Sequence, residues 1–566
     1  MQKRLSHFWK EFNRRKVLKV LIWYAGVAIV LIGLADDVAG PINLPEGTQR
    51  MVIIAAIIGF PLVMIFSWIF DITPEGIERT GSMEQPLGKD THLPDYPSNF
   101  EGSVAVLPFR DMSPDKDQEY FCEGISEEII NALARVESLK VIARTSAFAF
   151  KDQSIDIREI GQKLQVGNIL EGSLRKDGER LRITAQLIRV EDGFHLWSEV
   201  YDRDLKDVFK IQENIALEIT KKLNIKLLGK EKEAIEKSYT VDLEAYDLHL
   251  KGLYIWQKMT PEANKKAVEY YEASIRKDPQ FALGYSILAG NYLFTVYAGF
   301  SPPMYAIPKS KELTLKAIEM DDAVTVAYAN LATITMFFDW NWEAGEEIML
   351  KGLRLIPNSG WDHWYYSGIL QAINRYEKAI IEAKRALELD PFNVFINIEF
   401  GYLLFFARKY DLALEKLLWS CDMYPDNFLA YLHLGEVYRA KEKFPEAIDA
   451  FEKAVQFSGG VPLAVSRLAW VYQETDKSKE AEELIKQLEQ SRDKIYVPCT
   501  CFVPYYILKK DYDQAHHWLS KACDERDFFL PNCISYPVDA YQIPDQPRFT
   551  KLIKRTGLDK YQNIER

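Results

Sequence analysis

Small residues recur every 34 positions in the second half of this 566-residue chain. The clearest series is four alanines 34 residues apart, Ala379, Ala413, Ala447 and Ala481. Other positions keep the same interval: Gly401, Gly435 and Ala469, then Pro391 and Pro425, then Tyr438 and Tyr472. A unit of this length fits one helix pair. Its small residues let neighbouring helices approach closely, and its proline ends the second helix before the next unit begins. Stacked pairs bury a continuous core, so the period predicts an all-α superhelix with a concave inner face.

This pattern resembles the tetratricopeptide repeat (TPR). We expect repeat units near 245–279, 282–322, 325–357, 360–391, 394–425, 428–459, 462–492 and 498–525. The array spans 240–525, and residues 526–566 form a C-terminal cap over the last hydrophobic face. The resemblance implies that the chain recognises protein partners.

In TPR arrays the first helix of each pair forms most of the concave face. That face here carries the candidate partner-binding residues Phe337, Tyr365, Tyr402, Phe405, Phe406, Arg439 and Trp470, beside Ile398, Leu432, Glu436 and Gln473. The lysine and asparagine set that clamps a C-terminal carboxylate in other TPR proteins is missing. The groove therefore suits an apolar or amphipathic helix, with Arg439 as its one anion anchor. Alternatively, these aromatic side chains pack against a neighbouring repeat or against the preceding domain.

The N-terminal region has the pattern of a membrane anchor. Residues 1–19 form a basic interfacial segment, with seven basic side chains against the single acid Glu11. Two apolar stretches, 20–35 and 51–70, then predict a two-helix transmembrane hairpin over 20–70. The basic start places residues 1–19 inside the cell, so we expect a multi-pass protein of the bacterial inner (cytoplasmic) membrane with most of its chain in the cytoplasm. The alternatives are a cleaved signal peptide over 20–35 and DNA contact by residues 1–19.

Residues 80–102 have the composition of a linker, because glycine and proline recur there without apolar periodicity. Short β runs then alternate with amphipathic helices over 103–230, which predicts an α/β domain. We expect strands at 104–109, 139–143 and 195–201, a hairpin of 170–175 with 180–190, and helices over 155–164 and 208–227. Ser126 is the expected N-cap of a further helix. The whole chain is therefore expected to be multidomain: a transmembrane hairpin, an α/β domain and an all-α TPR superhelix.

Long motifs of the α/β region resemble the TolB amino-terminal-like domain of bacterial signalling proteins. They are SVAVLPFRDMSPDKDQEYFCEGISEEI (103–129), LKVIARTSAFAFK (139–151), LEGSLRKDGERLRITAQLI (170–188) and HLWSEVYDRDLKDVFKIQENIALEI (195–219). Two earlier stretches, FNRRKV (12–17) and GFPLVMIFSWIFDITPEGIERT (59–80), look like the same group. Members often carry this domain behind a class III adenylate cyclase or a winged-helix DNA-binding domain, and neither pattern occurs in this sequence. The resemblance implies a signalling role without either activity.

No catalytic or cofactor signature stands out. The patterns G-x-x-x-x-G-K-[ST], G-x-G-x-x-G, H-E-x-x-H and G-x-S-x-G are absent, and the S-x-x-K matches at Ser113 and Ser173 lack their companion motifs. The best metal candidates are Cys499, Cys501, His516, His517, Cys523 and Cys533, although buried thiols and surface histidines account for them equally. The strand residues Glu171, Arg175, Arg182, Asp202 and Arg203 could line a small-ligand site or form solvated ion pairs.

The net charge of −12 argues against nucleic acid as a partner, because phosphate binding needs a basic face. We therefore expect no catalytic residues, no cofactor and no metal. The expected partners are a protein or peptide segment and inner-membrane lipid. The expected function is that of a membrane-tethered scaffold or adaptor in bacterial signalling. A regulatory protein that senses a ligand through its α/β domain is the alternative, and an enzyme with cyclase-related activity is a third possibility.

Overall fold

The computed structural model describes residues 70–73, 76–79, 102–153, 155–235, 242–256, 261–537, 543 and 546–561. The chain divides into two compact units, Met1–Tyr96 and Pro97–Arg566. In the first unit the described residues form an antiparallel hairpin of β1 (Phe70–Thr73) and β2 (Gly76–Arg79).

No helix among the described residues is long and apolar enough to cross a membrane. The hairpin expected over 20–70 lies outside these residues, except for Phe70 in β1. On this finding the prediction of a multi-pass inner-membrane protein is contradicted, and we withdraw it. The prediction rested on hydropathy alone, which measures how readily a segment could enter a bilayer and does not by itself show that it forms a span.

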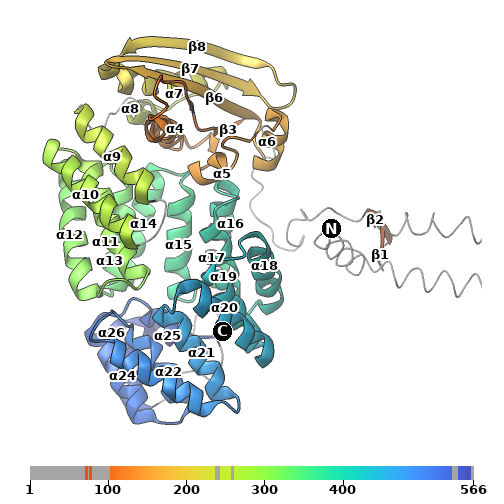
Figure 1. The fold of residues 1–566 in the computed structure, drawn as a ribbon, viewed down its shortest axis with the longest axis vertical. Coiled ribbons are helices and arrows are strands. Elements are labelled where there is room, and N and C mark those ends of the chain that lie inside the picture. Colours follow the sequence, from red (N-terminus) through yellow and green to blue (C-terminus); the bar gives the residue numbers. More distant parts are fainter. Residues whose placement is uncertain are drawn as a thin grey trace, which may run out of the picture. The chain divides into compact units, whose positions relative to one another are not determined.

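The second unit begins with a mixed sheet whose strands run in the order β5-β3-β6-β7-β8, with β4 paired to β6 (Figure 1). The strands are β3 (Ser103–Val106), β4 (Arg110–Asp111), β5 (Lys140–Val141), β6 (Asn168–Asp177), β7 (Arg180–Arg189) and β8 (His195–Asp204). Strand β3 lies parallel to β5 and β6, whereas β6, β7 and β8 are antiparallel. Gly178, at φ +56°, supplies the turn between β6 and β7.

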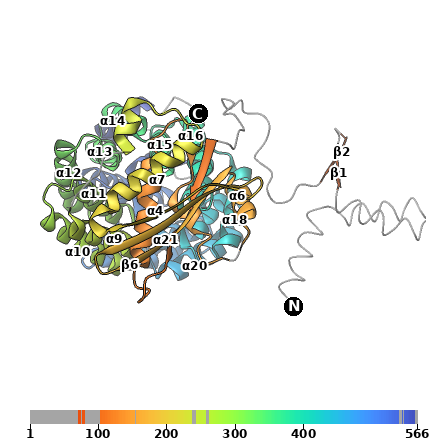
Figure 2. The ribbon, with the colours of Figure 1, turned by 90° about the horizontal axis from the view of Figure 1, so that it is seen from above.

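Helices cover both faces of the parallel part of this sheet. They are α4 (Glu119–Leu133), α5 (Arg144–Phe148), α6 (Ile157–Leu164) and α7 (Val208–Lys222), followed by α8 (Gly229–Ile235). Val104 and Val106 of β3 join a core with α4 and α7, whereas Ala105 between them joins a core with α5 and α6. This alternation follows from the two-residue period of a strand. Figure 2 shows the strands crossing over α4 and α7.

Two local expectations for this domain were wrong. Helix α4 begins at Glu119, so Ser126 lies inside it and not at its N-cap. The Ser126 hydroxyl instead donates to the Cys122 carbonyl at 3.1 Å and accepts from the Phe109 amide at 3.0 Å, which ties the helix to the loop after β3. The strand expected over 139–143 is shorter: β5 covers only Lys140–Val141, because helix α5 begins at Arg144.

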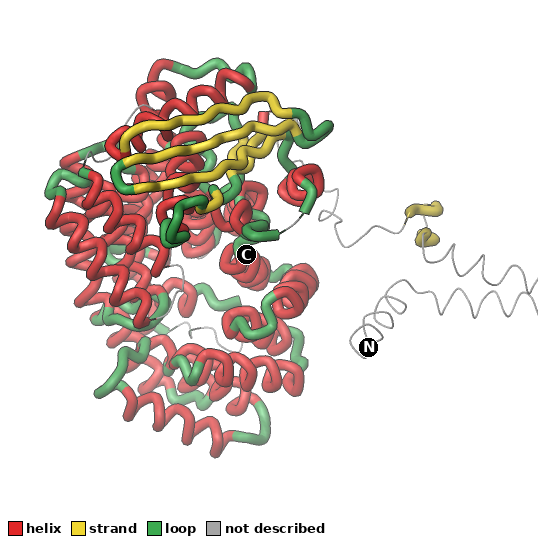
Figure 3. Tube along the Cα trace, turned by 45° about the horizontal axis from the view of Figure 1, so that its top comes forward, coloured by secondary structure: helices red, strands yellow, loops and turns green. Residues whose placement is uncertain are grey.

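Antiparallel helix pairs make up the rest of the unit (Figures 1 and 3). Their helices are α9 (Leu243–Trp256) and α10 (Pro261–Lys277), α11 (Ala282–Tyr297) and α12 (Pro303–Met320), α13 (Thr325–Phe337) and α14 (Trp342–Leu355), α15 (Gly360–Ala372) and α16 (Tyr376–Leu389), α17 (Val394–Phe406) and α18 (Tyr410–Met423), α19 (Phe428–Ala440) and α20 (Phe444–Ser458), α21 (Pro462–Glu474) and α22 (Ser478–Ser491), and α23 (Val503–Leu508) and α24 (Tyr512–Asp524). The C-terminal elements are α25 (Leu530–Ile534) and α26 (Pro547–Thr556). The all-helical superhelix is therefore confirmed.

The 34-residue ladder marks where the helices touch. Its four alanines are all 0% exposed. A Cβ added at Gly401 would lie 2.6 Å from Leu417 Cγ, and one added at Gly435 would lie 2.6 Å from Phe451 Cε1. Real Cβ atoms do not approach other atoms so closely, so a larger residue at either position would force the Leu417 or Phe451 side chain to move.

The α/β domain is fixed directly to the helix pairs. The Asp390 carboxylate, after α16, accepts from the amide and hydroxyl of Ser146 in α5, at 3.0 and 2.5 Å. The Ala143 amide donates to the Leu389 carbonyl at 2.8 Å, and Phe150 meets Phe392 edge to face at 5.7 Å. Apolar residues of α9 also join the sheet core, as Leu250 does beside Gly124. The sheet and the repeats thus share a buried boundary.

Candidate functional site

All seven candidate partner-binding residues lie on first helices of the repeats: Phe337 on α13, Tyr365 on α15, Tyr402, Phe405 and Phe406 on α17, Arg439 on α19 and Trp470 on α21. The structure separates them by exposure. Five are buried, namely Tyr402, Phe405, Phe406, Arg439 and Trp470. Phe337 is half-buried, and only Tyr365, at 37%, is exposed. Two different surroundings account for this division.

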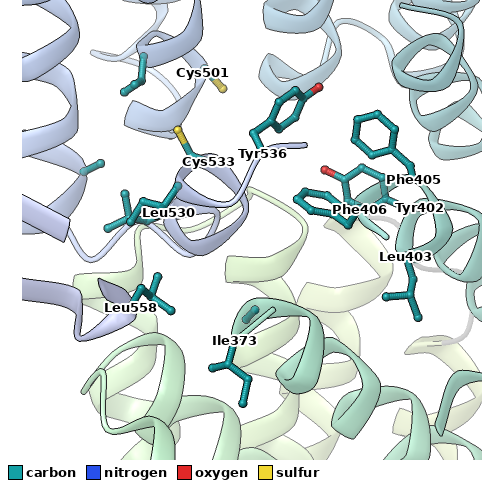
Figure 4. Close-up of a cluster of buried hydrophobic side chains, with 14 of the residues drawn as sticks. Ile373, Tyr402, Leu403, Phe405, Phe406, Cys501, Leu530, Cys533, Tyr536 and Leu558 are labelled. Carbon is teal, nitrogen blue, oxygen red and sulfur yellow. The ribbon is translucent and has the colours of Figure 1, made fainter. Parts of the chain in front are cut away.

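The buried five face a segment of the chain's own C-terminal region. Tyr536, which follows α25, projects toward α17 (Figure 4). Its ring centre lies 5.7 Å from Phe405, 6.1 Å from Phe406 and 6.1 Å from Trp470. Edge-to-face contacts at these distances are favourable beyond the area they bury. Around Tyr536, the inner face of the repeats is therefore filled from within the chain.

Charged side chains surround the Tyr536 hydroxyl. The Tyr536 hydroxyl donates to the Glu436 carboxylate and accepts from Arg439 Nη2 at 2.8 Å. Arg467 Nε donates to the other oxygen of Glu436 at 2.6 Å, and Arg439 also lies 3.7 Å from the carboxylate of Glu474. Burial raises the pKa of Tyr536 well above its usual value, so its hydroxyl stays protonated and can donate. The two acids balance the two bases, as buried charges require. Arg439, expected as a free anion anchor, thus already has carboxylate partners.

The C-terminal residues are held at several further points. Phe528 stacks on Phe337 at 4.7 Å, which explains why the candidate at 337 is covered. The Arg526 guanidinium lies 3.7 Å above the Trp340 ring. At the end of α26, the Thr556 carbonyl accepts from the Trp342 indole nitrogen at 2.6 Å. Asn374 Nδ2, between α15 and α16, donates to the Tyr561 carbonyl at 3.1 Å. The described residues of 526–561 therefore reach back to the pairs α13–α14 and α15–α16 as well as packing beside α24.

A second aromatic group on the first helices is less covered. It consists of Tyr297 on α11, Trp361, Trp364 and Tyr365 on α15, and Phe395 on α17, and we name it the aromatic platform. Trp364 lies 4.8 Å from both Tyr365 and Phe395, and Tyr297 lies 5.6 Å from Phe395. The other four members of the platform are half-buried. This platform unites residues from three repeats.

The sequence reasoning selected only Tyr365 from this platform. The missed signal was local, because Trp361 and Trp364 precede Tyr365 by four and one positions on the same helix. Tyr297 and Phe395 could not have been found in that way, since only the stacking of α11, α15 and α17 brings them to Trp364.

Of the other sequence candidates, Arg175, Arg182 and Asp202 are brought together as exposed cross-strand neighbours on β6, β7 and β8. Among the described residues, no group of three His, Cys, Asp or Glu side chains could hold a metal ion. Cys499, Cys501, Cys523 and Cys533 are all buried as free thiols. On the sheet, Asp202 is paired with Arg180, and Arg175 lies 3.7 Å from Asp177. The Ser113 hydroxyl accepts from the Lys176 amide at 3.0 Å, which is a structural contact.

Two family models match parts of the chain. Residues 100–218 match the second domain of the HilA/YgeH-like transcriptional regulators, and residues 398–462 match the tetratricopeptide repeat. The TolB amino-terminal-like resemblance of the same α/β region is not among these matches and stays a prediction.

The curated relatives are matched over part of their length. A putative adenylate cyclase 3 of Rhizobium meliloti is 36% identical over 233 residues, which are 41% of this chain and 39% of the relative. The transcriptional regulator HilA of Salmonella typhimurium is 22% identical over 327 residues, 57% of each chain. Thus the chain spans less than two thirds of the length of either relative.

Two solved structures with a distant likeness to this chain are yeast Tom70 and PilF of Pseudomonas aeruginosa. Yeast Tom70 covers 63% of this chain and 80% of its own at 15% identity and a TM-score of 0.36. PilF of Pseudomonas aeruginosa covers 38% of this chain and 96% of its own at 20% identity and a TM-score of 0.27. Together with the helix pairs, the family matches show that the chain contains tetratricopeptide repeats, preceded by a domain similar to the second domain of the HilA/YgeH-like regulators.

Proposed function

We propose that this protein is a non-enzymatic adaptor in bacterial signalling, which holds a segment of a partner protein against the first helices of its TPR superhelix. The observation that carries the proposal is the aromatic platform. Most of the apolar inner face is covered by the chain itself, whereas Tyr365 stays 37% exposed among half-buried rings. Rigid aromatic side chains that are partly desolvated are enriched where proteins bind each other.

The fixed α/β domain supports this role. Since Asp390 and Ser146 bond it to the loop after α16, the domain and the repeats that carry the platform are presented together. A rigid support lowers the ordering cost of binding. Direct contact with nucleic acid is not part of the proposal, because the net charge is −12 and the platform has no basic side chain.

Site-specific photocrosslinking in bacteria tests the adaptor role. A photoreactive phenylalanine analogue would replace Tyr365 on the platform or, as the matched control, Leu412 on the outer helix α18, since both are 37% exposed. The expected result is a discrete protein adduct from position 365 and none from position 412. Adducts from position 412 alone, or from neither position, would contradict the proposal.

A further inference from the structure

Strand β8 is the long open edge of the mixed sheet. It ends the strand order β5-β3-β6-β7-β8, and no described strand pairs with its outer side. Figure 1 shows it at the top of the second unit. The strand at the opposite edge, β5, has only two residues, whereas β8 has ten. Open edges are usually short or interrupted, because their free amides and carbonyls otherwise pair with another chain. The length of β8 is therefore unusual for an edge that stays unpaired.

The regular part of β8 directs half of its backbone groups outward. Its register with β7 is continuous over residues 197–204. One residue further, the Leu205 amide donates to the Glu179 carbonyl at 2.8 Å, which continues this register. Because bonded and non-bonded pairs alternate in an antiparallel ladder, the backbone groups of the even-numbered residues point away from β7. The strand contains neither proline nor lysine, and Val200 at its centre is 48% exposed. It therefore offers donors and acceptors to a further strand.

Two charges on β8 are left over after the contacts within the sheet are made. Asp202 and Asp204 are both paired with Arg180 of β7. The Glu199 carboxylate accepts from neutral side chains of its own strand, and the Arg203 guanidinium donates to the Asp202 carbonyl. Over the part of the chain that the structure describes, no base pairs with Glu199 and no acid with Arg203. Both side chains are exposed, so both charges are available to a partner.

These two charges are complementary between two copies of the strand. A two-fold axis across the open edge brings identical strands together antiparallel. With the axis at Tyr201, Glu199 of each copy faces Arg203 of the other, at a non-bonded pair where side chains lie closest. Val200 then faces Asp202, and no two like charges stand directly opposite. In-register parallel pairing would instead set each charge beside its like, which is unfavourable.

We propose that β8 pairs antiparallel with β8 of a second copy of this chain, so that the two sheets join into one and Glu199 of each copy forms an ion pair with Arg203 of the other. The backbone hydrogen bonds hold the strands together, and the ion pairs select the register. This self-association goes beyond the proposed adaptor function and does not depend on it.

Sedimentation equilibrium of the full-length protein tests the pairing. Wild type should form a dimer of twice the 65.4 kDa mass of one chain. Glu199→Arg sets arginine against arginine and Arg203→Glu sets glutamate against glutamate, so each should raise the dimer dissociation constant at least about tenfold. The double variant Glu199→Arg/Arg203→Glu restores opposite charges and should return the dissociation constant to near the wild-type value. Arg276→Glu, at an exposed side chain of α10, is the matched control and should leave it unchanged.

Val200→Pro tests the backbone pairing separately. It removes one outward amide and none that bonds to β7, a position where edge strands accept proline, and it should also shift the protein toward the monomer. Circular dichroism at 222 nm checks that each variant is folded, and the charge variants carry the test if Val200→Pro does not fold.

Three results would overturn the inference. The first is a wild-type chain that stays monomeric at about 100 μM, where a pair of micromolar affinity is largely dimeric. The second is a dimer that either charge reversal, or a folded Val200→Pro variant, leaves at wild-type strength. The third is loss of the dimer in both single variants without recovery in the double variant, which would show that Glu199 and Arg203 do not face each other.

Discussion

Replacing Tyr536 with phenylalanine tests whether the C-terminal segment is a structural part of the concave face. The substitution keeps the ring against Phe405 and Trp470 and removes only the hydroxyl. Glu436 and Arg439, whose side chains are each 1% exposed, would then each lose a hydrogen bond that bulk solvent does not reach to replace. Hydrogen bonds to buried charged groups are worth about 1.5–3 kcal/mol each, so we expect a loss of about 2–4 kcal/mol in the free energy of unfolding.

Tyr536→Ala should cost more, because the ring would be lost as well. Truncation of a buried aromatic side chain costs about 3–5 kcal/mol before the hydrogen bonds are counted. Urea unfolding followed by circular dichroism at 222 nm would measure both variants. Tyr431→Phe, at a half-buried tyrosine on the same helix as Glu436, is the control and should change stability by less than about 0.5 kcal/mol. If Tyr536→Phe unfolds at the wild-type urea concentration, the segment does not seal the buried charges and the reasoning fails.

Four further outcomes follow from the same packing. Gly401→Ala should destabilise the protein by about 1–3 kcal/mol, whereas Gly368→Ala, where an added Cβ would meet no atom within 4 Å, should stabilise it by about 0.5–1 kcal/mol in the same urea assay; opposite signs would contradict the contact analysis. Asp390→Ala should leave two buried donors of the α/β domain unpaired, at a cost of about 2–4 kcal/mol, and calorimetry should show that domain unfolding at a lower temperature than the repeats. Burial raises the pKa of Asp362 from 3.8 to about 6, so its contribution to stability is complete below pH 4 and is lost as the pH rises through 6. The advantage of Asp362→Asn over wild type should accordingly grow from near zero at pH 4 to at most about 3 kcal/mol at pH 7, and a constant difference would refute this assignment. Burial also raises the pKa of the Cys501 thiol to about 12, so a thiol reagent at pH 8 should modify that cysteine far more slowly in the native protein than in urea, and equal rates would show that it is accessible.

The expectations that the structure confirms depend on local or periodic patterns. The ladder through Ala379 and Gly401 predicts helix contacts because a repeat must present the same small residue at each helix crossing. The turn at Gly178 follows from its φ of +56°, which glycine adopts without steric cost. By contrast, Ser126 has the chemistry of an N-cap but lies inside α4, where it bonds to the loop after β3. Propensity alone does not distinguish these two uses of one hydroxyl.

The candidate site shows the same limit more clearly. The sequence by itself determined that aromatic residues such as Phe405 and Trp470 face inward, because their helix and phase within the repeat are fixed by the period. Only the tertiary structure decided what they face, because Tyr536 is 66 or more positions away from them in the sequence. A period describes contacts between neighbouring repeats, whereas the return of a C-terminal segment to the inner face is a long-range contact with no periodic signal. For that reason the sequence placed these residues on the first helices of the repeats, and the fold decided that Tyr365 is exposed while Phe405 and Trp470 are buried.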